Sequence, residues 1–266
     1  MDKSILSQFL KAGFIFDGTF FNTDKGTPQG GIISPILANM TLDGIEKLLN
    51  EHFRKMKVHF IRYCDDFLVT VPSKEIADEV RKVIRDFLAI RGLELSVEKT
   101  IVTHIDEGFD FLGWNFRKYK GTLLIKPSQK SIESITQKIK NIVSKAKAWT
   151  QEELIKTLNP IIRGWANYHR HIVAKNAFKK LDHYLWRVTW QWGKRRHPNK
   201  GHKWVASKYW HSERNRNWIF QTMNTKLIKF SDIQIRRHTM PKLDTNPYKD
   251  RKYFLKRKER IQKQTP

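Results

Sequence analysis

Cysteine is nearly absent from this sequence, which holds only Cys64 among its 266 residues. A single cysteine cannot form a disulfide within the chain, and it cannot supply the cysteine-rich ligand sets of structural zinc sites. His169 and His171 do not indicate a metal site either, because no cysteine or carboxylate pattern with ligand spacing lies near them. The sequence therefore excludes a fold held together by disulfides or by a cysteine-rich zinc site.

Long apolar runs are also missing. No stretch approaches the roughly 20 apolar residues that span a bilayer. Met1 is followed by a short amphipathic segment containing Asp2 and Lys3 rather than by a signal peptide. The basic residues lie on no segment with a clean apolar opposite face, which argues against an interfacial membrane helix. We therefore expect a soluble intracellular protein, bacterial cytoplasmic or organellar, with no membrane partner.

Acidic residues are scarce in the second part of the chain. Residues 1–116 hold 14 Lys and Arg against 17 Asp and Glu, a net charge of −3, whereas residues 117–266 hold 37 against 9, a net charge of +28. The whole surplus of +25 therefore belongs to the second part. Such a charge repels itself unless an anionic partner offsets it, and the usual partner is nucleic acid. The asymmetry indicates two functions in one chain, one of them binding a polyanion.

Eight of the nine tryptophans lie in the same basic part. Aromatic side chains among Lys and Arg suit RNA, because unstacked bases can lie on aromatic or guanidinium planes. For any single tryptophan, a position in the core is the commoner outcome. Trp204 and Trp210 are the better surface candidates, because they flank a basic loop rather than an apolar helix face.

The apolar content of 39% predicts a packed core, and the residue pattern divides the chain into elements. In the first part it predicts a short helix at residues 5–10 and a hairpin at 14–21. A helix capped by Ser34 follows, with one apolar stripe that continues to Phe53. Strands are predicted at 58–63 and 67–71, and a helix from Ser73 to Gly92. Shorter strands are expected near residues 93–95, 101–104, 109–115 and 123–125. From Ser131 onward the period is helical; Thr150 and Glu153 form a capping box, Asn159-Pro160 restarts the helix, and a further helix runs from Phe178 to Trp192.

Asp65 and Asp66 lie at the tip of a predicted hairpin, between two apolar runs of strand length. The two carboxylates repel each other, and we expect the flanking strands to hold them in a partly buried position. A divalent cation would offset the repulsion, and Mg²⁺ prefers a few carboxylate oxygens together with water and phosphate. In nucleotidyl transfer, two such ions activate the attacking hydroxyl and stabilise the leaving oxygen. The dipeptide alone is more often an ordinary turn, so its context decides.

That context resembles reverse transcriptases in four segments that follow one another in the family's order. They are GTPQGGIISPILANMTLDGIEKLL from Gly26, FIRYCDDFLV from Phe60, GLELSVEKT from Gly92 and GFDFLG from Gly108. The later segment from Leu158 to Gly201, LNPIIRGWANYHRHIVAKNAFKKLDHYLWRVTWQWGKRRHPNKG, is similar to the maturase-specific region of group II intron proteins. The resemblance covers nearly the whole chain, from about Gly13 to Lys249. We therefore interpret the chain as part of a group II intron reverse transcriptase/maturase, a protein of mobile elements.

The resemblance implies a role for individual residues. Asp65 and Asp66 would be the catalytic residues and the ligands of Mg²⁺. The nucleotide and template would be contacted by Gln29, Gly30, Tyr63 and Lys99, and the primer-grip turn would consist of Phe111, Leu112 and Gly113. The glycines make physical sense where backbone approaches a substrate closely. The candidate phosphate contacts are Arg163, Arg170, Lys194, Arg195, Arg196, Lys200 and Lys203.

The resemblance also implies a fold. It is α+β, with a partial polymerase palm of antiparallel sheet and helices, followed by an all-α thumb and maturase region. The predicted domains are the distal half of the palm at residues 1–127, the thumb helix at 128–149, the RNA-binding maturase region at 150–247 and a basic tail at 248–266. The implied partners are group II intron RNA, an RNA template and a DNA primer.

Two departures from the family stand out. A palm needs a further aspartate from a strand that precedes GTPQGG, and the aspartates before Gly26 are Asp2, Asp17 and Asp24, none of them in a strand of that kind. No cysteine- and histidine-rich endonuclease region follows Tyr248. The chain thus resembles the C-terminal portion of a longer protein, whether a split protein, the remnant of a mobile element or a shortened gene model.

Three hypotheses remain open. The first is an RNA-directed DNA polymerase, a nucleotidyltransferase that is incomplete alone and receives the fingers and first palm motif from another chain. The second is a non-catalytic RNA-binding cofactor of splicing. The third is a nonfunctional remnant with an exposed core.

Overall fold

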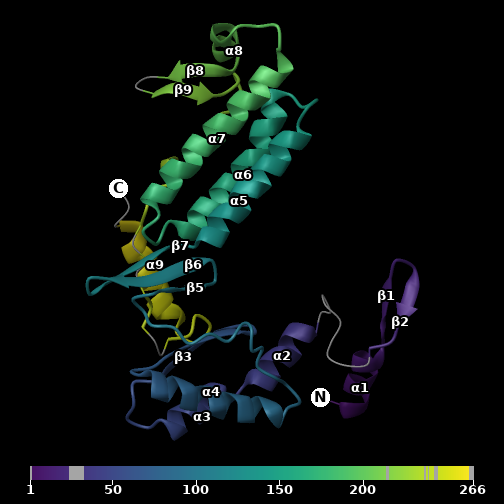
Figure 1. Ribbon diagram of the computed structural model, residues 1–266, viewed down its shortest axis with the longest axis vertical. Coiled ribbons are helices and arrows are strands. Elements are labelled where there is room, and N and C mark those ends of the chain that lie inside the picture. The colour runs from purple at the N-terminus through teal and green to yellow at the C-terminus, as the bar shows by residue number, and fades with distance from the viewer. Residues whose placement is uncertain are drawn as a thin grey trace. The chain divides into compact units, whose positions relative to one another are not determined.

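The computed structural model describes residues 2–23, 33–213, 216–236, 238, 240–242 and 245–263. It consists of two compact units, an N-terminal unit, Met1–His104, and a C-terminal unit, Ile105–Pro266 (Figure 1). Among the described residues, no helix has both the length and the apolar composition required to cross a lipid bilayer.

The N-terminal unit combines short helices with two separate hairpins. Its elements in chain order are α1 Lys3–Lys11, β1 Phe14–Phe16, β2 Thr19–Phe21, α2 Ser34–Leu42, α3 Ile45–His52, β3 His59–Tyr63, β4 Asp66–Thr70 and α4 Lys74–Ala89. The β1–β2 turn has positive φ at Asp17 (51°) and Gly18 (78°), which confirms the predicted hairpin. Ser73 caps α4 as predicted, because its hydroxyl accepts a hydrogen bond from the Ile76 amide.

The core of this unit lies between α3, α4 and one face of the β3–β4 hairpin. Ile45 and Leu49 of α3 pack against Val80 and Ile84 of α4, and all four side chains are at most 3% exposed. Phe60, Phe67 and Val69 of the hairpin pack against this cluster from the sheet side. The hairpin is thereby held by its apolar face, and its turn extends beyond the core.

Three predictions for this unit were wrong in detail. The expected single stripe from residue 34 to 53 is two helices, because Gly44 adopts a left-handed conformation (φ 96°) between α2 and α3. The cap of α2 is Ile33 rather than Ser34, which is already helical. Residues 93–95 and 101–104 form no strand, since no described segment pairs with them and the chain instead turns at residues 97–99.

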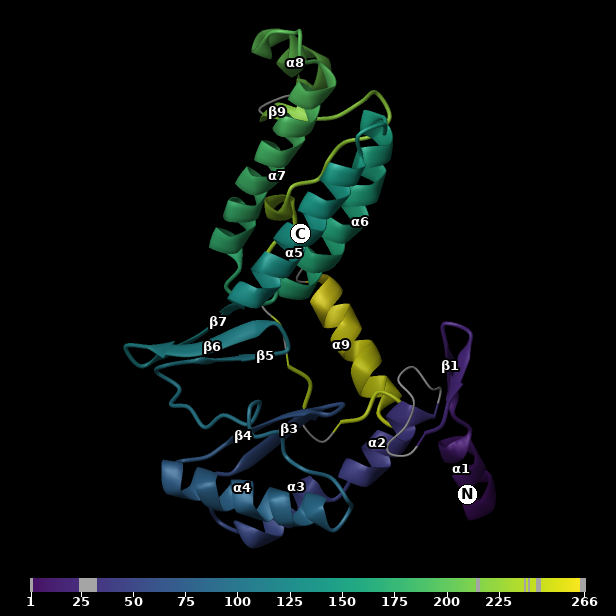
Figure 2. The ribbon, with the colours of Figure 1, turned by 45° about the vertical axis from the view of Figure 1, so that its right-hand side comes forward.

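The C-terminal unit joins a small sheet to a helical bundle (Figure 2). Its elements in chain order are β5 Phe109–Phe111, β6 Trp114–Tyr119, β7 Thr122–Pro127, α5 Gln129–Lys145, α6 Gln151–His169, α7 Lys175–Arg196, α8 His202–Tyr209, β8 Trp210–Glu213, β9 Arg216–Phe220, the 3₁₀ helix η1 Phe230–Asp232 and α9 Arg251–Lys263. The sheet is antiparallel in the order β5-β6-β7.

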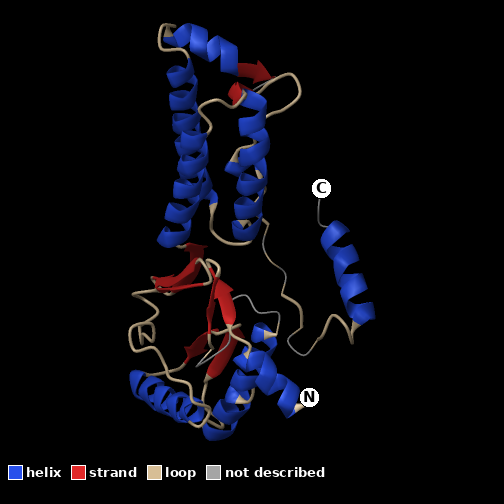
Figure 3. Cartoon of the chain, turned by 90° about the vertical axis from the view of Figure 1, so that its right-hand side faces the viewer, coloured by secondary structure: helices blue, strands red, loops and turns tan. Residues whose placement is uncertain are grey.

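The helices α5, α6 and α7 surround one apolar core; Figures 1 and 2 show the three helices side by side, and Figure 3 shows the bundle from another side. Its fully buried members include Ile139 of α5, Leu154 and Leu158 of α6, and Phe178 of α7. The predicted capping box of α6 is present, because the Glu153 carboxylate accepts from the Thr150 amide at 2.7 Å and the Thr150 hydroxyl accepts from the Glu153 amide at 3.2 Å.

Two predictions for the helical region of this unit are corrected by the fold. Pro160 does not restart a helix but lies inside α6. Burial of Leu158 and Ile162 on either side of it keeps the helix continuous, although proline removes one backbone hydrogen bond. The region expected to be all-helical also contains the β8–β9 hairpin. The domain boundaries given above describe functional regions rather than compact units, and they stay predictions.

Candidate nucleic-acid interface and carboxylate turn

The aspartate pair lies at the end of the β3–β4 hairpin. Tyr63 pairs with Asp66, so Cys64 and Asp65 form a two-residue loop. Cys64 has φ of 56°, a left-handed conformation that glycine usually supplies at the first position of such a turn. Backbone strain of this kind often marks functional sites, because the surrounding structure must hold the residue in place. Here Arg62 braces the turn by donating hydrogen bonds to the Cys64 carbonyl at 3.1 Å and to Asn39 of α2 at 2.9 Å.

The expected partial burial of the carboxylates was wrong. Tyr63, Cys64, Asp65 and Asp66 are all exposed, because the apolar face that anchors the hairpin ends before the turn. No hydrogen bond or ion pair with another described residue engages the side-chain carboxylate of Asp65 or Asp66. Two adjacent carboxylates with unengaged oxygens suit Mg²⁺, which keeps water and takes few protein ligands.

A third protein ligand is missing from the part of the chain that the structure describes. No group of three His, Cys, Asp or Glu side chains suited to a metal ion occurs there. Asp2 caps α1 by accepting a hydrogen bond from the Ser4 amide, and Asp17 lies in the β1–β2 turn. Asp24 lies outside the described residues. The pair therefore fits a metal ion as part of a ligand set.

The other predicted nucleotide contacts are not gathered around this turn by any described interaction. Gln29 and Gly30 lie outside the described residues. Lys99 lies in an exposed turn, where its amide donates to the Ser96 carbonyl. No hydrogen bond or ion pair between described residues joins Lys99 to Tyr63, Asp65 or Asp66.

In the C-terminal unit, Leu112 and Gly113 form the tight turn between β5 and β6. Both have positive φ, 50° and 78°, which splits the single strand expected at residues 109–115 into a hairpin. The Ser128 amide donates to the Gly113 carbonyl at 2.9 Å, and the Tyr168 hydroxyl donates to the Leu112 carbonyl at 2.7 Å. The turn is thus tied to the start of α5 and to the end of α6.

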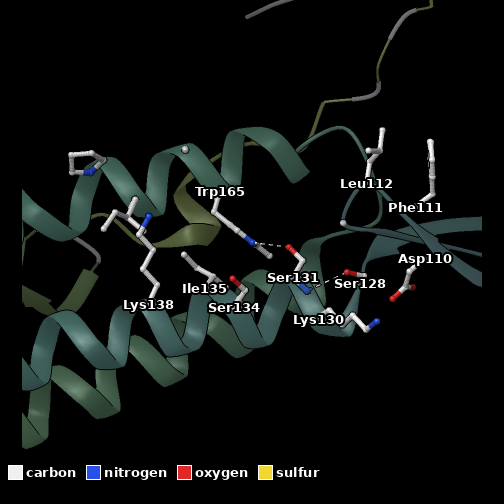
Figure 4. A pocket seen from close by; sticks show the side chains of 14 residues that line it. Asp110, Phe111, Leu112, Ser128, Lys130, Ser131, Ser134, Ile135, Lys138 and Trp165 are labelled. Atoms are coloured by element: carbon white, nitrogen blue, oxygen red, sulfur yellow. Dashed lines mark hydrogen bonds between the residues drawn. The ribbon is translucent and has the colours of Figure 1, made fainter. Parts of the chain in front are cut away.

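A groove of about 790 Å³ lies between this turn and the two helices (Figure 4). Its residues from the turn are Asp110, Phe111, Leu112 and Gly113; its residues from the helices include Lys130, Ser131, Ser134, Lys138, Gly164 and Trp165. The structure therefore places all three residues of the predicted primer-grip turn on one groove. Lys130 and Lys138 lie about two turns apart on α5, and both line the groove and bring positive charge to it.

A polar cluster joins α5 and α6 beside this groove. The Trp165 indole donates to the Ser131 hydroxyl at 3.1 Å, a bond drawn as a dashed line in Figure 4. The same hydroxyl pairs with Nε2 of His169, also at 3.1 Å. Burial lowers the pKa of His169 to about 4, so its ring is neutral at physiological pH. Sequence inspection missed this cluster, because its members are remote from one another along the chain.

The predicted phosphate contacts divide into two groups. Arg163, Lys194, Arg195, Lys200 and Lys203 are exposed, and no ion pair of the described residues involves them. Arg196 and Arg170 are engaged within the fold instead. Arg196 donates to the carbonyls of Lys147 and Trp149 at 2.8 and 2.7 Å. Arg170 donates to the Gln234 carbonyl at 3.2 Å.

Comparison with known proteins shows the same two parts. Residues 1–116 match the family described as reverse transcriptase (RNA-dependent DNA polymerase), and residues 132–210 match the group II intron, maturase-specific domain. Residues 1–116 thus belong to the reverse transcriptase family, and residues 132–210 belong to the family of group II intron maturase-specific domains. Enzymes of the reverse transcriptase family use divalent metal ions.

Individual relatives agree with this membership. The chain is 25% identical to the group II intron-encoded protein LtrA of Lactococcus lactis subsp. cremoris, over 69% of this chain and 45% of that protein. It is 30% identical to maturase-like protein 1 of Euglena longa, over 55% of this chain and 33% of that protein. It is also 30% identical to protein YkfC of Escherichia coli, over 41% and 37% of the two chains. The chain thus spans less than half the length of these curated relatives.

In the C-terminal unit, the tryptophans differ widely in exposure. Trp210 is 6% exposed and packs against Phe220, so its predicted surface position was wrong. Trp204 is 39% exposed, which confirms the prediction for that residue. Trp186 and Trp218, which the sequence did not distinguish from core residues, are 39% and 52% exposed. For Trp186, the helical spacing to His183 and Trp190 was the signal available in the sequence.

Proposed function

We propose that this maturase-family chain binds group II intron RNA through its C-terminal unit and promotes splicing of the intron. The observation that carries the proposal is the net charge of +28 on residues 117–266. Exposed residues such as Arg163, Lys194 and Arg195 have no carboxylate partner among the described residues, so their charge is available to phosphates. Group II intron RNA occurs in the bacterial cytoplasm or in an organelle, and we expect the protein to act in one of these places.

We further propose that the N-terminal unit supplies part of a polymerase site for RNA-directed DNA synthesis. Asp65 and Asp66 would hold Mg²⁺, which when bound activates the attacking hydroxyl and stabilises the leaving oxygen. The exposed turn leaves both carboxylates accessible, and Tyr63 beside them is 62% exposed, as a contact to primer or nucleotide requires. Gln29, Gly30 and Lys99 complete the proposed nucleotide and template contacts.

The groove of the C-terminal unit fits the proposed primer grip. Its turn residues Leu112 and Gly113 are fixed to α6 and to the start of α5 by hydrogen bonds to their carbonyls, so a nucleic-acid strand would meet a rigid wall. Lys130 and Lys138 on α5 would contact phosphates of a DNA primer or RNA template. Helix α5, which lies within residues 128–149, corresponds to the proposed thumb.

A second candidate function is a non-catalytic splicing cofactor. It is favoured by the missing third ligand, because Asp65 and Asp66 have no additional carboxylate beside them among the described residues. Under this alternative, the chain needs only its basic C-terminal unit. Reverse transcription would then require another chain that supplies the fingers and the first palm motif.

Two assays on the full chain separate these functions. RNA binding is measured with a group II intron transcript at a series of salt concentrations, and the affinity should fall steeply with salt because phosphate contacts release counterions. A salt-independent affinity would contradict the proposal. Primer extension on an RNA template with Mg²⁺ is measured for the chain and for its Asp65→Ala/Asp66→Ala variant.

The double variant distinguishes the two candidates. Incorporation that disappears in the variant supports a completed polymerase site, whereas no incorporation in either protein leaves RNA binding as the function. Intron binding should be the same in both proteins, since the substituted residues lie outside the basic unit.

A further inference from the structure

Four aromatic rings form a continuous column on the surface of the maturase-specific region. His183, Trp186 and Trp190 follow one another at helical spacing on α7, and their rings are nearly parallel. The centroids of His183 and Trp186 are 6.1 Å apart at 26°, and those of Trp186 and Trp190 are 6.0 Å apart at 13°. Trp218 of β9 meets Trp190 edge-on at 6.3 Å. Figure 1 shows the β8–β9 hairpin beside the C-terminal half of α7.

The column is anchored in the core at one point and open elsewhere. Trp190 also contacts Trp210, which is 6% exposed and belongs to the core. Trp186 and Trp218 remain 39% and 52% exposed, although Trp192 on the same helix is 3% exposed. Large aromatic faces left in water cost hydrophobic free energy, so an exposed column of them indicates a binding surface.

The backbone conformation at Trp218 also indicates a binding surface. Its φ is 60°, a left-handed conformation that is rare for a bulky residue. The pairing of β8 and β9 shifts register between His211 and Glu213, and such irregularities re-aim side chains. The strained backbone at Trp218 thus carries an indole that is exposed to solvent and not packed in the core. Backbone strain of this kind concentrates at functional positions.

Positive charge lies directly beside the column. Lys179, Lys180 and Arg187 surround a surface hollow of about 510 Å³ together with His183 and Tyr184. None of the three cations forms an ion pair with a carboxylate of the described residues, and all three are exposed. The Arg187 guanidinium lies 5.2 Å from the centre of the Tyr184 ring, which orients it along α7.

We propose that this aromatic column binds unpaired RNA bases, with Lys179, Lys180 and Arg187 holding the adjacent phosphates. The proposal rests on the RNA-binding function proposed above and names the part of the RNA involved, a single-stranded segment. Bases in a duplex are stacked on one another and cannot reach aromatic side chains, whereas unpaired bases stack on them with little sequence preference. Cations beside stacking rings are the arrangement that single-stranded nucleic acid requires.

The test compares three fluorescently labelled probes on the full chain by anisotropy. They are a short unstructured oligoribonucleotide, the same backbone with abasic positions, and an RNA duplex of equal length. The variants are Trp186→Ala, Trp218→Ala and the conservative Trp186→Tyr. Tyr119→Ala is the matched control, because Tyr119 is also 39% exposed in the same unit but lies on β6, outside the column.

Each alanine variant should weaken binding of the unpaired probe by roughly tenfold. Binding of the abasic and duplex probes should be unchanged, which also verifies that the variants fold. Trp186→Tyr should retain most of the affinity, and Tyr119→Ala should retain all of it.

Two results would overturn the proposal. Equal losses on all three probes would show that the column does not contact bases. Normal, salt-dependent binding of the unpaired probe by both alanine variants would reject the column while leaving the proposed RNA-binding function intact. If the unsubstituted chain bound no RNA at all, both the column and the proposed function would fall.

Discussion

His169 and Ser131 join α6 to α5 through one short contact, 3.1 Å between Nε2 and Oγ. The His169 side chain belongs to a residue only 1% exposed, and its Nδ1 atom has no hydrogen-bond partner among the described residues. Because burial disfavours the charged form, the pKa of His169 falls to about 4. Burial of His169 therefore makes the stability of the bundle beside the groove sensitive to pH.

The free energy of unfolding should therefore depend on pH through His169. The unfolded chain protonates this histidine near pH 6.5, whereas the folded chain does so near 4. The stabilisation is complete above the unfolded pKa and is lost as the pH falls through the window from 6.5 to 4. The expected loss is on the order of 1–3 kcal/mol. Denaturant unfolding at a series of pH values measures it.

The control for this prediction is His169→Gln, which keeps a polar side chain but cannot titrate. The pH dependence of the variant should be shallower than that of the unsubstituted chain across the window. Two parallel curves would show that other groups cause the acid sensitivity.

Two neighbouring arginines at the end of α7 should behave differently. Arg196→Ala removes hydrogen bonds to the carbonyls of Lys147 and Trp149 and the packing of its guanidinium on Trp192. It should cost about 1–2 kcal/mol of stability. Arg195→Ala should change stability by no more than about 0.5 kcal/mol. It should reduce the slope of log RNA affinity against log salt concentration by about one, which corresponds to one phosphate contact. Equal effects of the two variants on thermal unfolding would contradict the assignment.

Two helical glycines form a second matched pair. A Cβ added to Gly164 of α6 meets nothing within 4 Å, so Gly164→Ala should raise stability by roughly 0.5–1 kcal/mol through helix propensity. At Gly193 of α7 the added Cβ would lie 3.3 Å from Tyr209 and Val205. Gly193→Ala should therefore lower stability by about 1 kcal/mol, because α7 and α8 must separate. Unfolding midpoints that shift in the same direction would show that packing there adjusts freely.

The strained turn at Cys64 gives a fourth prediction. Its φ of 56° suits glycine and opposes β-branched side chains. Cys64→Gly should preserve or slightly raise stability, whereas Cys64→Val should lower it by about 1–2 kcal/mol. Denaturant unfolding measures both. A valine variant as stable as the glycine variant would mean that the turn relaxes without cost.

Much of the fold follows from patterns that are local in the chain. The Asp17-Gly18 turn, the strands on either side of Cys64 and the capping box at Thr150 were all predictable, because each depends on residues within a few positions of one another. The break at Gly44 was predictable in principle, but the apolar stripe continued across it and concealed it. Pro160 shows the opposite error, since burial of the flanking residues outweighs its local preference.

The site was only partly predictable. The sequence identified Asp65, Asp66 and the turn of Phe111, Leu112 and Gly113, and it located the basic half of the chain. It did not separate Arg196, which is engaged in the fold, from Arg195, which is exposed. Both are the same residue type in the same charged run, so composition cannot distinguish them.

By itself, the sequence determined the order of the motifs, the periods of the helices and strands and the strong charge asymmetry, because these depend on neighbouring residues alone. Only the tertiary structure decided which tryptophans face water, which arginines are available to phosphate and which side chains meet at the groove. Trp210 and Trp218 belong to the same short hairpin, yet one is buried and the other exposed. That difference arises from how the hairpin packs against α7. Contacts between segments far apart in the chain produce no local pattern in the sequence from which they could be predicted.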